Sequence, residues 1–235
     1  MLLVHSYESM GTFDGPGLRL VVFLQGCPFR CLYCANPDTI DARGEAVETA
    51  PEHILDMAID QKPFYGKRGG ITFSGGEPTV QARELIPLFE RLREAGVHIC
   101  LDTNGSIVSD DVDRLHDLTD IVLLDVKQIR DEKHRALTGL SNRNTLENAR
   151  RLARKGKDVW LRYVLVPGIS DSEEDIHELG RQLGPMTNIR RVEILPYHTL
   201  GVHKYAAMGL PYKLAAPPPT PPPARPRPPP LPGGV

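Results

Sequence analysis

Alternating strand and helix patterns constrain the fold of this chain more than any other feature. Compact apolar runs rich in β-branched residues predict strands, and stretches with apolar residues at helical spacing predict the helices between them. Strands are expected over 18–25, 70–74, 97–103, 121–127, 159–166 and 191–196, and helices over 51–59, 82–95, 110–118, 145–155 and 172–183. Strands joined by helices form right-handed crossovers, which indicates an α/β protein with a parallel sheet. A doubly wound sheet and a partial barrel both satisfy this pattern.

Polar residues that core packing does not explain end or follow each of these six strands. In chain order they are Cys27, the segment GGEP at 75–78, Asp102 with Thr103 and Asn104, Asp125 with Lys127, Arg162, and His198. In both candidate architectures, ligands bind at the carboxyl ends of the strands. The sequence therefore predicts one polar mouth built from six successive strand ends.

Three of the four cysteines, Cys27, Cys31 and Cys34, are grouped in the segment CPFRCLYC. Thiolates at this spacing are typical of a metal or iron–sulfur site. A four-iron cluster needs four ligands, so three cysteines leave one iron open to a small molecule.

Two other ligand sets remain open for these cysteines. A zinc site of the Cys3His type would use His5, His198 or His203 as its fourth ligand. A four-cysteine electron-transfer cluster would need Cys100. That residue shares a strand face with Asp102 but lies one layer deeper, which favours a place in the core.

Composition argues against several other classes of protein. The net charge of −2 gives no electrostatic basis for binding nucleic acid. No apolar stretch is long enough to span a membrane, and no signal peptide is expected. Four cysteines in 235 residues are expected to stay reduced, which indicates a cytoplasmic protein.

The last segment of the chain has a composition unlike the rest. Eleven of the 22 prolines lie between Pro217 and Pro232, and such a run forms neither helix nor sheet. We expect a globular domain over 1–214 and a disordered, proline-rich, low-complexity tail over 215–235. The tail has the composition that a frameshift in a GC-rich gene would give.

Motifs along nearly all of residues 1–214 resemble the radical S-adenosylmethionine (radical SAM) superfamily, and most closely its glycyl-radical activases. The matching segments are GTFDGPG (11–17), QGCPFRCLYCAN (25–36), GGITFSGGE (69–77), LDTNG (101–105), LDVKQ (124–128), WLRYV (160–164), VPG (166–168), LPYH (195–198) and GVHK (201–204). The cysteine triplet identifies the superfamily, and the DGPG, LDTNG and LPYH segments narrow it to the activases.

The chain departs from the family pattern in two places. Ala35 stands where a histidine often follows the third cysteine, and we expect little effect because this position contributes backbone contact. The proline-rich tail replaces a family segment with helical character that packs on the barrel. The barrel is therefore expected to expose some apolar surface on its closing side.

The resemblance implies a partial (β/α)6 barrel and a radical enzyme. Cys27, Cys31 and Cys34 would hold a [4Fe–4S] cluster whose open iron binds S-adenosylmethionine. One electron would cleave this cofactor to methionine and a 5′-deoxyadenosyl radical, which removes hydrogen from a glycine of pyruvate formate-lyase under anaerobic conditions. Flavodoxin or ferredoxin would supply the electron, and the chain would act as a monomer.

The resemblance also assigns candidate site residues. The cofactor contacts would be Tyr33, Cys34, Ala35, Gly75, Gly76, Glu77, Asp125, Val126, Lys127 and His198. Asp102, Thr103 and Asp125 offer hard oxygens suited to a monovalent cation beside the cofactor. Asp14, Arg19 and Arg162 would receive the substrate peptide. The alternative functions are activation of another glycyl-radical enzyme, such as anaerobic ribonucleotide reductase, and electron transfer or iron sensing by a bound cluster.

Overall fold

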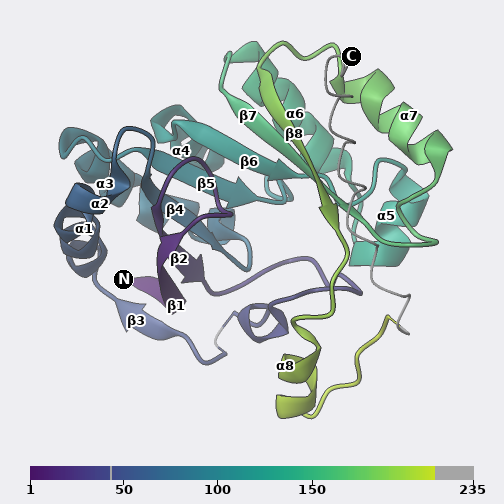
Figure 1. Ribbon diagram of the computed structural model, residues 1–235, viewed down its shortest axis with the longest axis horizontal. Coiled ribbons are helices and arrows are strands. Elements are labelled where there is room, and N and C mark those ends of the chain that lie inside the picture. Colours follow the sequence, from purple (N-terminus) through teal and green to yellow (C-terminus); the bar gives the residue numbers. More distant parts are fainter. Residues whose placement is uncertain (43, 215–235) are drawn as a thin grey trace, which may run out of the picture.

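One sheet organises the molecule, and the computed structural model describes it over residues 1–42 and 44–214. Its strand order is β3-β1-β2-β4-β5-β6-β7-β8. Six neighbouring strands of this sheet are β2 (Arg19–Leu24), β4 (Gly70–Gly75), β5 (Ile99–Thr103), β6 (Ile121–Asp125), β7 (Val159–Leu165) and β8 (Ile189–Pro196). These six pair in parallel throughout. The predicted parallel sheet is confirmed, and it is open, with β3 and β8 as its edges (Figure 1).

Two strands that pair in antiparallel fashion extend the sheet beside β2. Strand β1 (Leu2–Gly11) pairs with β2, and the short strand β3 (Val47–Thr49) pairs with β1. Neither was predicted from the sequence. Together they cover the edge of β2, the strand that leads into the cysteine segment.

Helices cover the sheet between successive parallel strands (Figure 1). They are α1 (Pro51–Asp60), α2 (Lys62–Tyr65), α3 (Ala82–Glu94), α4 (Asp110–Leu118), α5 (Asp131–Thr138), α6 (Arg143–Arg154), α7 (Glu173–Leu183) and α8 (Val202–Ala207), with short 3-10 helices η1 (Pro37–Thr39) and η2 (Pro78–Gln81). Serine side chains cap the first turns of two of these helices. The Ser109 side chain accepts from the amide of Val112 at α4, and Ser172 accepts from that of Asp175 at α7.

The core consists of two main clusters, one over the half of the sheet that contains β2, β4 and β5 and the other over the half that contains β6 and β7. One packs α1, α3 and α4 against β2, β4 and β5, and it includes the apolar face of α3 that the sequence predicted. The other packs α6 and α7 against β6 and β7. A third, smaller cluster contains Tyr33, Leu137, Val166, Tyr197 and Leu214, and it ties the cysteine segment to the end of the described chain.

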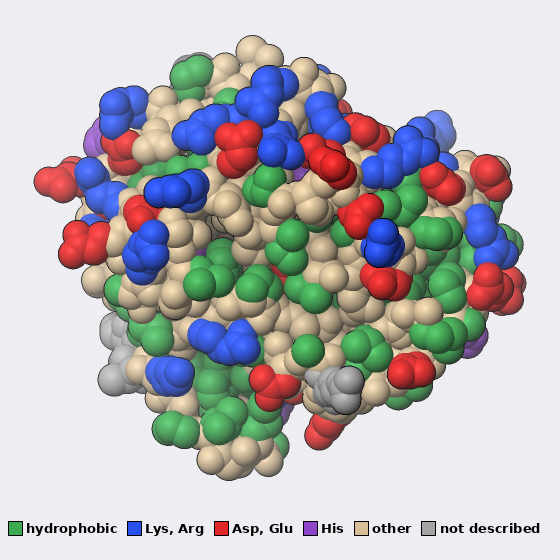
Figure 2. Space-filling model, turned by 180° about the vertical axis from the view of Figure 1, so that it is seen from behind, with side chains coloured by type: hydrophobic (Ala, Val, Ile, Leu, Met, Phe, Trp, Pro, Cys, Tyr) green, Lys and Arg blue, Asp and Glu red, His purple; other side chains and the backbone are tan. Residues whose placement is uncertain are grey.

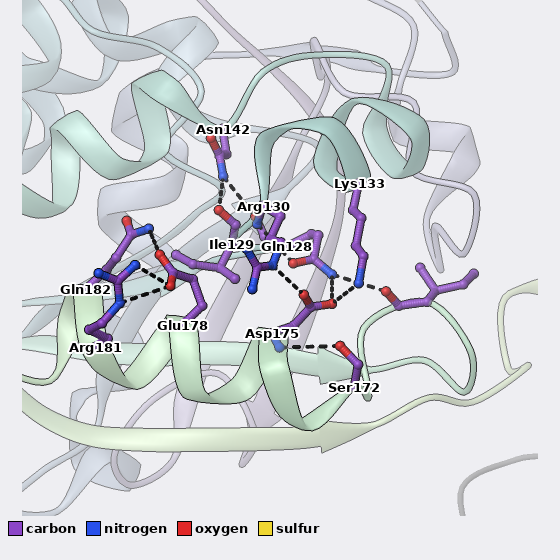
Figure 3. Close-up of polar contacts among 11 residues, drawn as sticks. Gln128, Ile129, Arg130, Lys133, Asn142, Ser172, Asp175, Glu178, Arg181 and Gln182 are labelled. Carbon is purple, nitrogen blue, oxygen red and sulfur yellow. Dashed lines mark hydrogen bonds and ion pairs between the residues drawn. The ribbon is translucent and has the colours of Figure 1, made fainter.

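A buried carboxylate joins α7 to the loop after β6 (Figure 3). Asp175, whose side chain is fully buried, accepts from Gln128 Nε2 at 2.9 Å and forms ion pairs with Arg130 at 3.1 Å and Lys133 at 2.7 Å. Burial acts to raise its pKa, but these partners outweigh burial and hold the pKa at about 2. We call this group the Asp175 anchor.

The outer face of β8 exposes apolar side chains, whereas the outer faces of the other parallel strands bury theirs. Val192 is 54% exposed and Ile194 is 46% exposed. The helix that follows β8 in the described chain, α8, packs near η1 and the cysteine segment, away from these two side chains. This agrees with the expected apolar surface on the closing side, while the predicted tail, 215–235, lies outside the described residues.

Candidate active site

A cavity of about 230 Å³ lies at the carboxyl ends of the parallel strands, where the sequence predicted a polar mouth. Its walls come from the segment after β2, the ends of β4, β5 and β6, and the segment after β8. The lining residues are Cys27, Phe29, Cys31, Tyr33, Cys34, Ala35, Asn36, Thr39, Ile40, Ser74, Gly75, Gly76, Asp102, Thr103, Asn104, Asp125, Lys127, Val164, Leu195, Pro196, Tyr197 and His198.

The cysteine loop, residues 27–34, is held from two sides. The amides of Arg30 and Leu32 donate to the carbonyls of Thr138 and Leu137 at the end of α5, at 2.8 and 3.0 Å. The amide of Cys27 donates to Ile40 beyond η1 at 3.0 Å. The three thiols of the loop are free and half-buried, and all three line the cavity.

Gly75, the last residue of β4, and Gly76 after it bring backbone close to this loop. Gly75 has φ of 110°, a conformation that favours glycine. A Cβ on Gly76 would lie 2.3 Å from the carbonyl oxygen of Gly26 and 2.8 Å from that of Thr39. Only glycine fits here, and the bare backbone forms one wall of the cavity.

Glu77, named with Gly75 and Gly76 as a cofactor contact, does not line the cavity, and its side chain points into the protein. It is fully buried, and its Oε1 accepts from the amide and hydroxyl of Thr79 and from the hydroxyl of Thr103, at 3.0, 2.6 and 2.7 Å. Its Oε2 accepts from the amide of Asn104 at 2.7 Å. Burial raises its pKa, against these donors. Glu77 therefore fixes the end of β5 relative to the glycine turn.

Asp125 and Lys127 form an ion pair at the end of β6, as two residues on one strand face allow. Lys127 Nζ also lies 5.6 Å from the ring centre of Tyr33. Burial acts to lower the pKa of Lys127, but the charge of Asp125 outweighs it and raises the pKa well above its usual value. Within the described ranges, the buried Oδ1 of Asp125 has no hydrogen-bond partner.

Val126, between these two residues, is also placed differently from the prediction. Its side chain is fully buried in the core under α6 and α7, and its amide donates to the carbonyl of Arg162 at 2.9 Å. The strand pleat directs it away from the cavity, so neither its side chain nor its amide is available there.

The predicted cation ligands Asp102, Thr103 and Asp125 all line the cavity, but their oxygens are partly engaged. Asp102 Oδ2 accepts from the Ser74 hydroxyl at 2.8 Å and lies 3.4 Å from Arg162 Nη1. The Thr103 hydroxyl donates to Glu77 and accepts from the amide of Gly105. A cation here stays a prediction.

The segment after β8 closes the cavity opposite the glycines. His198 lies in the wall, and its Nδ1 accepts from the amide of Leu200 at 3.4 Å. A Cβ on Gly201 would lie 2.5 Å from the carbonyl oxygen of Ala35, so this segment rests directly on the backbone at Ala35. Ala35 itself lines the cavity, and its predicted backbone contact with the cofactor stays a prediction.

Of the three residues predicted to receive a substrate peptide, two meet beside the cavity. Arg162 forms ion pairs with Asp14 at 3.7 Å, Asp102 at 3.4 Å and Glu193 at 3.0 Å. Burial and the charge of Asp102 raise the pKa of Asp14 to about 6, against the effect of Arg162. Asp14 and Arg162 thus form one charged group next to the cavity wall at Asp102.

The third, Arg19, is placed where it cannot receive a peptide, which corrects that prediction. Its side chain is fully buried at the amino end of β2, opposite the mouth, and donates to Thr72 Oγ1 and to the carbonyls of Pro16 and Ile71. Burial lowers its pKa. Arg19 therefore lies at the amino ends of the strands, away from the cavity.

Several cavity residues were not named as site residues from the sequence. Ser74, Asn36 and Tyr197 are such residues, whereas Asn104, which also lines the wall, was named for the polar mouth but given no role. Asn104 and Tyr197 stand in the LDTNG and LPYH segments, so the motifs pointed to their segments. Nothing in the sequence marked Ser74 or Asn36 as a site residue, except that Ser74 precedes the glycine motif and Asn36 follows the cysteine motif.

A second hollow, of about 180 Å³, lies between the cysteine loop and α8, and we call it the outer groove. It is lined by Arg30, Cys31, Pro37, Ile40, Asp41, Tyr205, Met208, Leu210, Pro211 and Lys213. Hydrophobic side chains gather on the lobe of the molecule that α8 forms, whereas acidic and basic side chains are interspersed over the rest of that face (Figure 2). Met208 and Leu210 are among the exposed apolar residues.

Comparison with known proteins identifies the family. The sequence model of the Radical SAM superfamily matches residues 21–180. A pyruvate formate-lyase-activating enzyme of Staphylococcus epidermidis is 46% identical over 218 residues, which cover 90% of this chain and 87% of the relative. Pyruvate formate-lyase 1-activating enzyme of Escherichia coli K12 is 47% identical over 214 residues, with the same shares covered. This chain belongs to the pyruvate formate-lyase-activating enzymes of the radical SAM superfamily.

Solved structures show the radical SAM fold as well. SuiB of Streptococcus suis bound to S-adenosylmethionine superposes with a TM-score of 0.64 at 18% identity, covering 77% of this chain and 41% of SuiB. A domain of pyruvate-formate lyase-activating enzyme from Bacteroides vulgatus superposes with a TM-score of 0.51 at 24% identity, covering 60% of this chain and 96% of that domain.

Membership of the radical SAM superfamily implies a [4Fe–4S] cluster and S-adenosylmethionine, and the cavity fits both. Burial raises the pKa of Cys27 to about 11 and of Cys31 to about 12, so these free thiols need a positive partner to become thiolates. Among the described residues, no three His, Cys, Asp or Glu side chains converge closely enough to hold a single metal ion.

Proposed function

We propose that this chain activates pyruvate formate-lyase by cleaving S-adenosylmethionine and removing a hydrogen atom from a glycine of that enzyme under anaerobic conditions. The observation that carries the proposal is the meeting of three free thiols, a glycine turn and a buried ion pair in one cavity at the strand ends. The curated relatives, whose names state that they activate pyruvate formate-lyase, support the choice of partner.

Cys27, Cys31 and Cys34 would hold three irons of the cluster and leave the fourth facing the cavity. The reduced cluster, when bound, supplies the electron that cleaves the sulfonium of S-adenosylmethionine to give a 5′-deoxyadenosyl radical and methionine. The chain's own residues bind, orient and exclude water.

Each side of the cavity suits one part of the cofactor. The backbone at Gly75 and Gly76 can approach the methionine end closely, because neither residue carries a Cβ. Lys127 and Asp125, whose Oδ1 has no hydrogen-bond partner among the described residues, would face a ligand that carries both charges. Tyr33, Ala35 and His198 would bound the nucleoside end, and a monovalent cation would sit at Asp102 and Asp125.

The remaining assignments extend the same proposal. The charged group of Asp14 and Arg162 would position the substrate peptide beside the cavity. Residues 1–214 would form the functional domain, acting as a monomer with flavodoxin or ferredoxin as electron donor. Because the site needs reduced thiols, the compartment would be the cytoplasm. No helix of the described chain is long and apolar enough to cross a membrane.

The deciding experiment is anaerobic reconstitution with iron and sulfide, followed by dithionite, S-adenosylmethionine and pyruvate formate-lyase. We expect cofactor cleavage and a glycyl radical detected by electron paramagnetic resonance. Anaerobic ribonucleotide reductase, offered in parallel, should give no radical; a radical there alone would reassign the partner. A cluster that is reduced but never cleaves the cofactor would indicate electron transfer or iron sensing and overturn the proposal.

Cysteine variants test the cluster ligands within the same experiment. Replacing Cys27, Cys31 or Cys34 by Ala should abolish the four-iron cluster and all cofactor cleavage. Cys100→Ala is the matched control, because that thiol is buried at the depth of Arg19 and His98 and should leave both intact. Loss of the cluster in the Cys100 variant would instead make it a fourth ligand.

A further inference from the structure

Asn104, just beyond β5, is held on three sides by hydrogen bonds. Its amide donates to Glu77 Oε2 at 2.7 Å, and its carbonyl accepts from the hydroxyl of Thr145 at 2.6 Å. Its side-chain Oδ1 accepts from the amide of Ser106 at 3.0 Å. The residue is 7% exposed, so its orientation is fixed by protein contacts alone.

These contacts leave one polar group of Asn104 for the cavity. Because Oδ1 is engaged by Ser106, the side-chain nitrogen Nδ2 points toward the cysteine loop, where it donates to Cys27 Sγ at 3.6 Å. A sulfur acceptor is larger than oxygen, and this distance lies within the range for such a bond. Among the hydrogen bonds of the described residues, Asn104 provides the side-chain donor to a sulfur of the cysteine loop.

A fixed donor to a thiolate acts on the redox chemistry of a cluster that the thiolate binds. Hydrogen bonds to cysteine sulfurs are among the features that set the reduction potential of iron–sulfur clusters. Reduction adds one electron and thus negative charge to the cluster and its sulfurs. An N–H donor stabilises the more negative state more strongly, so it makes the cluster easier to reduce.

We propose that Asn104 is a positioning and tuning residue that raises the reduction potential of the cluster by donating a hydrogen bond to the Cys27 thiolate. The inference rests on the proposed seating of the cluster on Cys27. Glu77 and Thr145 contribute indirectly, because they hold the backbone from which the donor is aimed.

Two variants separate the donor from its support. Asn104→Asp keeps a side-chain oxygen that can accept from Ser106 but replaces the N–H donor with a carboxylate oxygen. Asn104→Leu removes both interactions at similar volume. Asn144→Ala is the matched control, because the Asn144 amide donates to the Ser106 carbonyl of the same loop at 2.8 Å and does not reach a cysteine.

The measurement is a redox titration of the reconstituted cluster, without S-adenosylmethionine, followed by electron paramagnetic resonance. At a fixed applied potential we expect both Asn104 variants to show a ratio of reduced to oxidised cluster about tenfold lower than the parent, a shift of ~59 mV to more negative potential. The Asn144 control should titrate like the parent. Iron and sulfide content is measured on each sample.

The outcomes distinguish this inference from the proposed function. A parent protein that takes up no four-iron cluster would defeat the proposed site itself. Parent and variants with full iron content and the same midpoint would overturn the role of Asn104. Weaker binding of S-adenosylmethionine with an unchanged midpoint would also overturn it, since Asn104 would then be a cofactor contact. If the Leu variant fails to load iron, the Asp variant decides.

Discussion

At the scale of single residues, close backbone approach decides what the cavity can hold. The Gly76 position faces the carbonyl oxygens of Gly26 and Thr39 at distances that exclude any side chain. The glycine turn therefore packs directly on the backbone beside the cysteine loop, and its bare backbone and the three cysteines line the same cavity. The charged residues Asp125 and Lys127 line the same cavity, and Lys127 lies beside Tyr33 of the cysteine loop.

Cofactor affinity is the readout for the residues opposite the glycines. Asp125→Ala should leave Lys127 buried without its partner, and His198→Ala should remove a ring from the wall. We expect each to weaken S-adenosylmethionine binding by roughly 1–3 kcal/mol with unchanged iron content, as for other lost contacts to charged groups. Equilibrium binding to the reconstituted protein checks this.

Asp60→Ala, at the exposed end of α1, is the control for that measurement and should bind like the parent. Unchanged affinity in both the Asp125 and His198 variants would place the cofactor elsewhere in the cavity.

Residue identity predicted the cavity better than it predicted the direction of each side chain. The cysteines, the glycines, Asp125, Lys127 and His198 were recognisable because few other roles explain such residues at strand ends. Glu77, Val126 and Arg19 stand in the same segments but point into the protein. Their directions depend on the pleat of β6, the turn after β4 and partners distant in sequence, none of which a motif contains.

At the scale of elements, α5 joins the cysteine loop to α7. Its last carbonyls accept from the amides of Arg30 and Leu32 in the cysteine loop, and its first turn is held by the Asp175 anchor through Arg130 and Lys133 (Figure 3). Phe29 of the loop packs edge-on against His134 of the helix, with ring centres 5.2 Å apart. The position of the loop thus depends on α7 as well as on α5.

The stability of this connection should depend on pH. The folded-state pKa of Asp175 is about 2, below its usual value of 3.8, so its contribution is present above pH ~4 and is lost as the pH falls toward 2. We expect Asp175→Asn to lower the free energy of unfolding at pH 7 by about 2 kcal/mol. The difference from the parent should shrink as the pH falls below 4. Urea unfolding at several pH values measures both.

Asp117→Asn is the matched control, because Asp117 pairs with Lys155 at 2.8 Å on the exposed surface. An exposed pair of this kind contributes under about 1 kcal/mol. Equal losses in the two variants, or a loss in Asp175→Asn that persists unchanged at low pH, would contradict the assigned role of the anchor.

The elements missed by the sequence are those whose stability comes from distant contacts. Helix α5 has eight residues, too few to be stable alone, and its partners lie in the cysteine loop and α7. Strand β1 is polar along its second half and β3 has three residues, so neither shows a clear strand pattern. The long helices α3 and α6, which carry their own apolar faces, were predicted within a few residues.

At the scale of the whole molecule, the open sheet leaves one side of its last strand uncovered. Val192 and Ile194 lie on the exposed outer face of β8, which among the described residues pairs only with β7. Exposed apolar side chains on an edge strand favour association between copies. The alternation of strands and helices predicted the parallel sheet, but it did not show which face would lack a helix.

Self-association at high concentration should therefore depend on this face. The double variant Val192→Thr with Ile194→Thr keeps β-branched residues and removes apolar surface, so we expect less light scattering and less binding of a hydrophobic dye. Cofactor affinity should be unchanged, since neither residue lines the cavity. Val47→Thr, which alters an exposed valine on the opposite edge strand, is the control. Scattering that falls equally in the control would implicate general surface hydrophobicity instead.

Cys31 stands in a wall common to the cavity and the outer groove. The cavity is where the cofactor would bind, and the outer groove opens beside α8. With a cluster seated at Cys31, an electron donor bound over the groove would lie close to the cluster while the cofactor occupied the cavity. The electron donor and the cofactor could then bind in either order, and both could be bound at the same time.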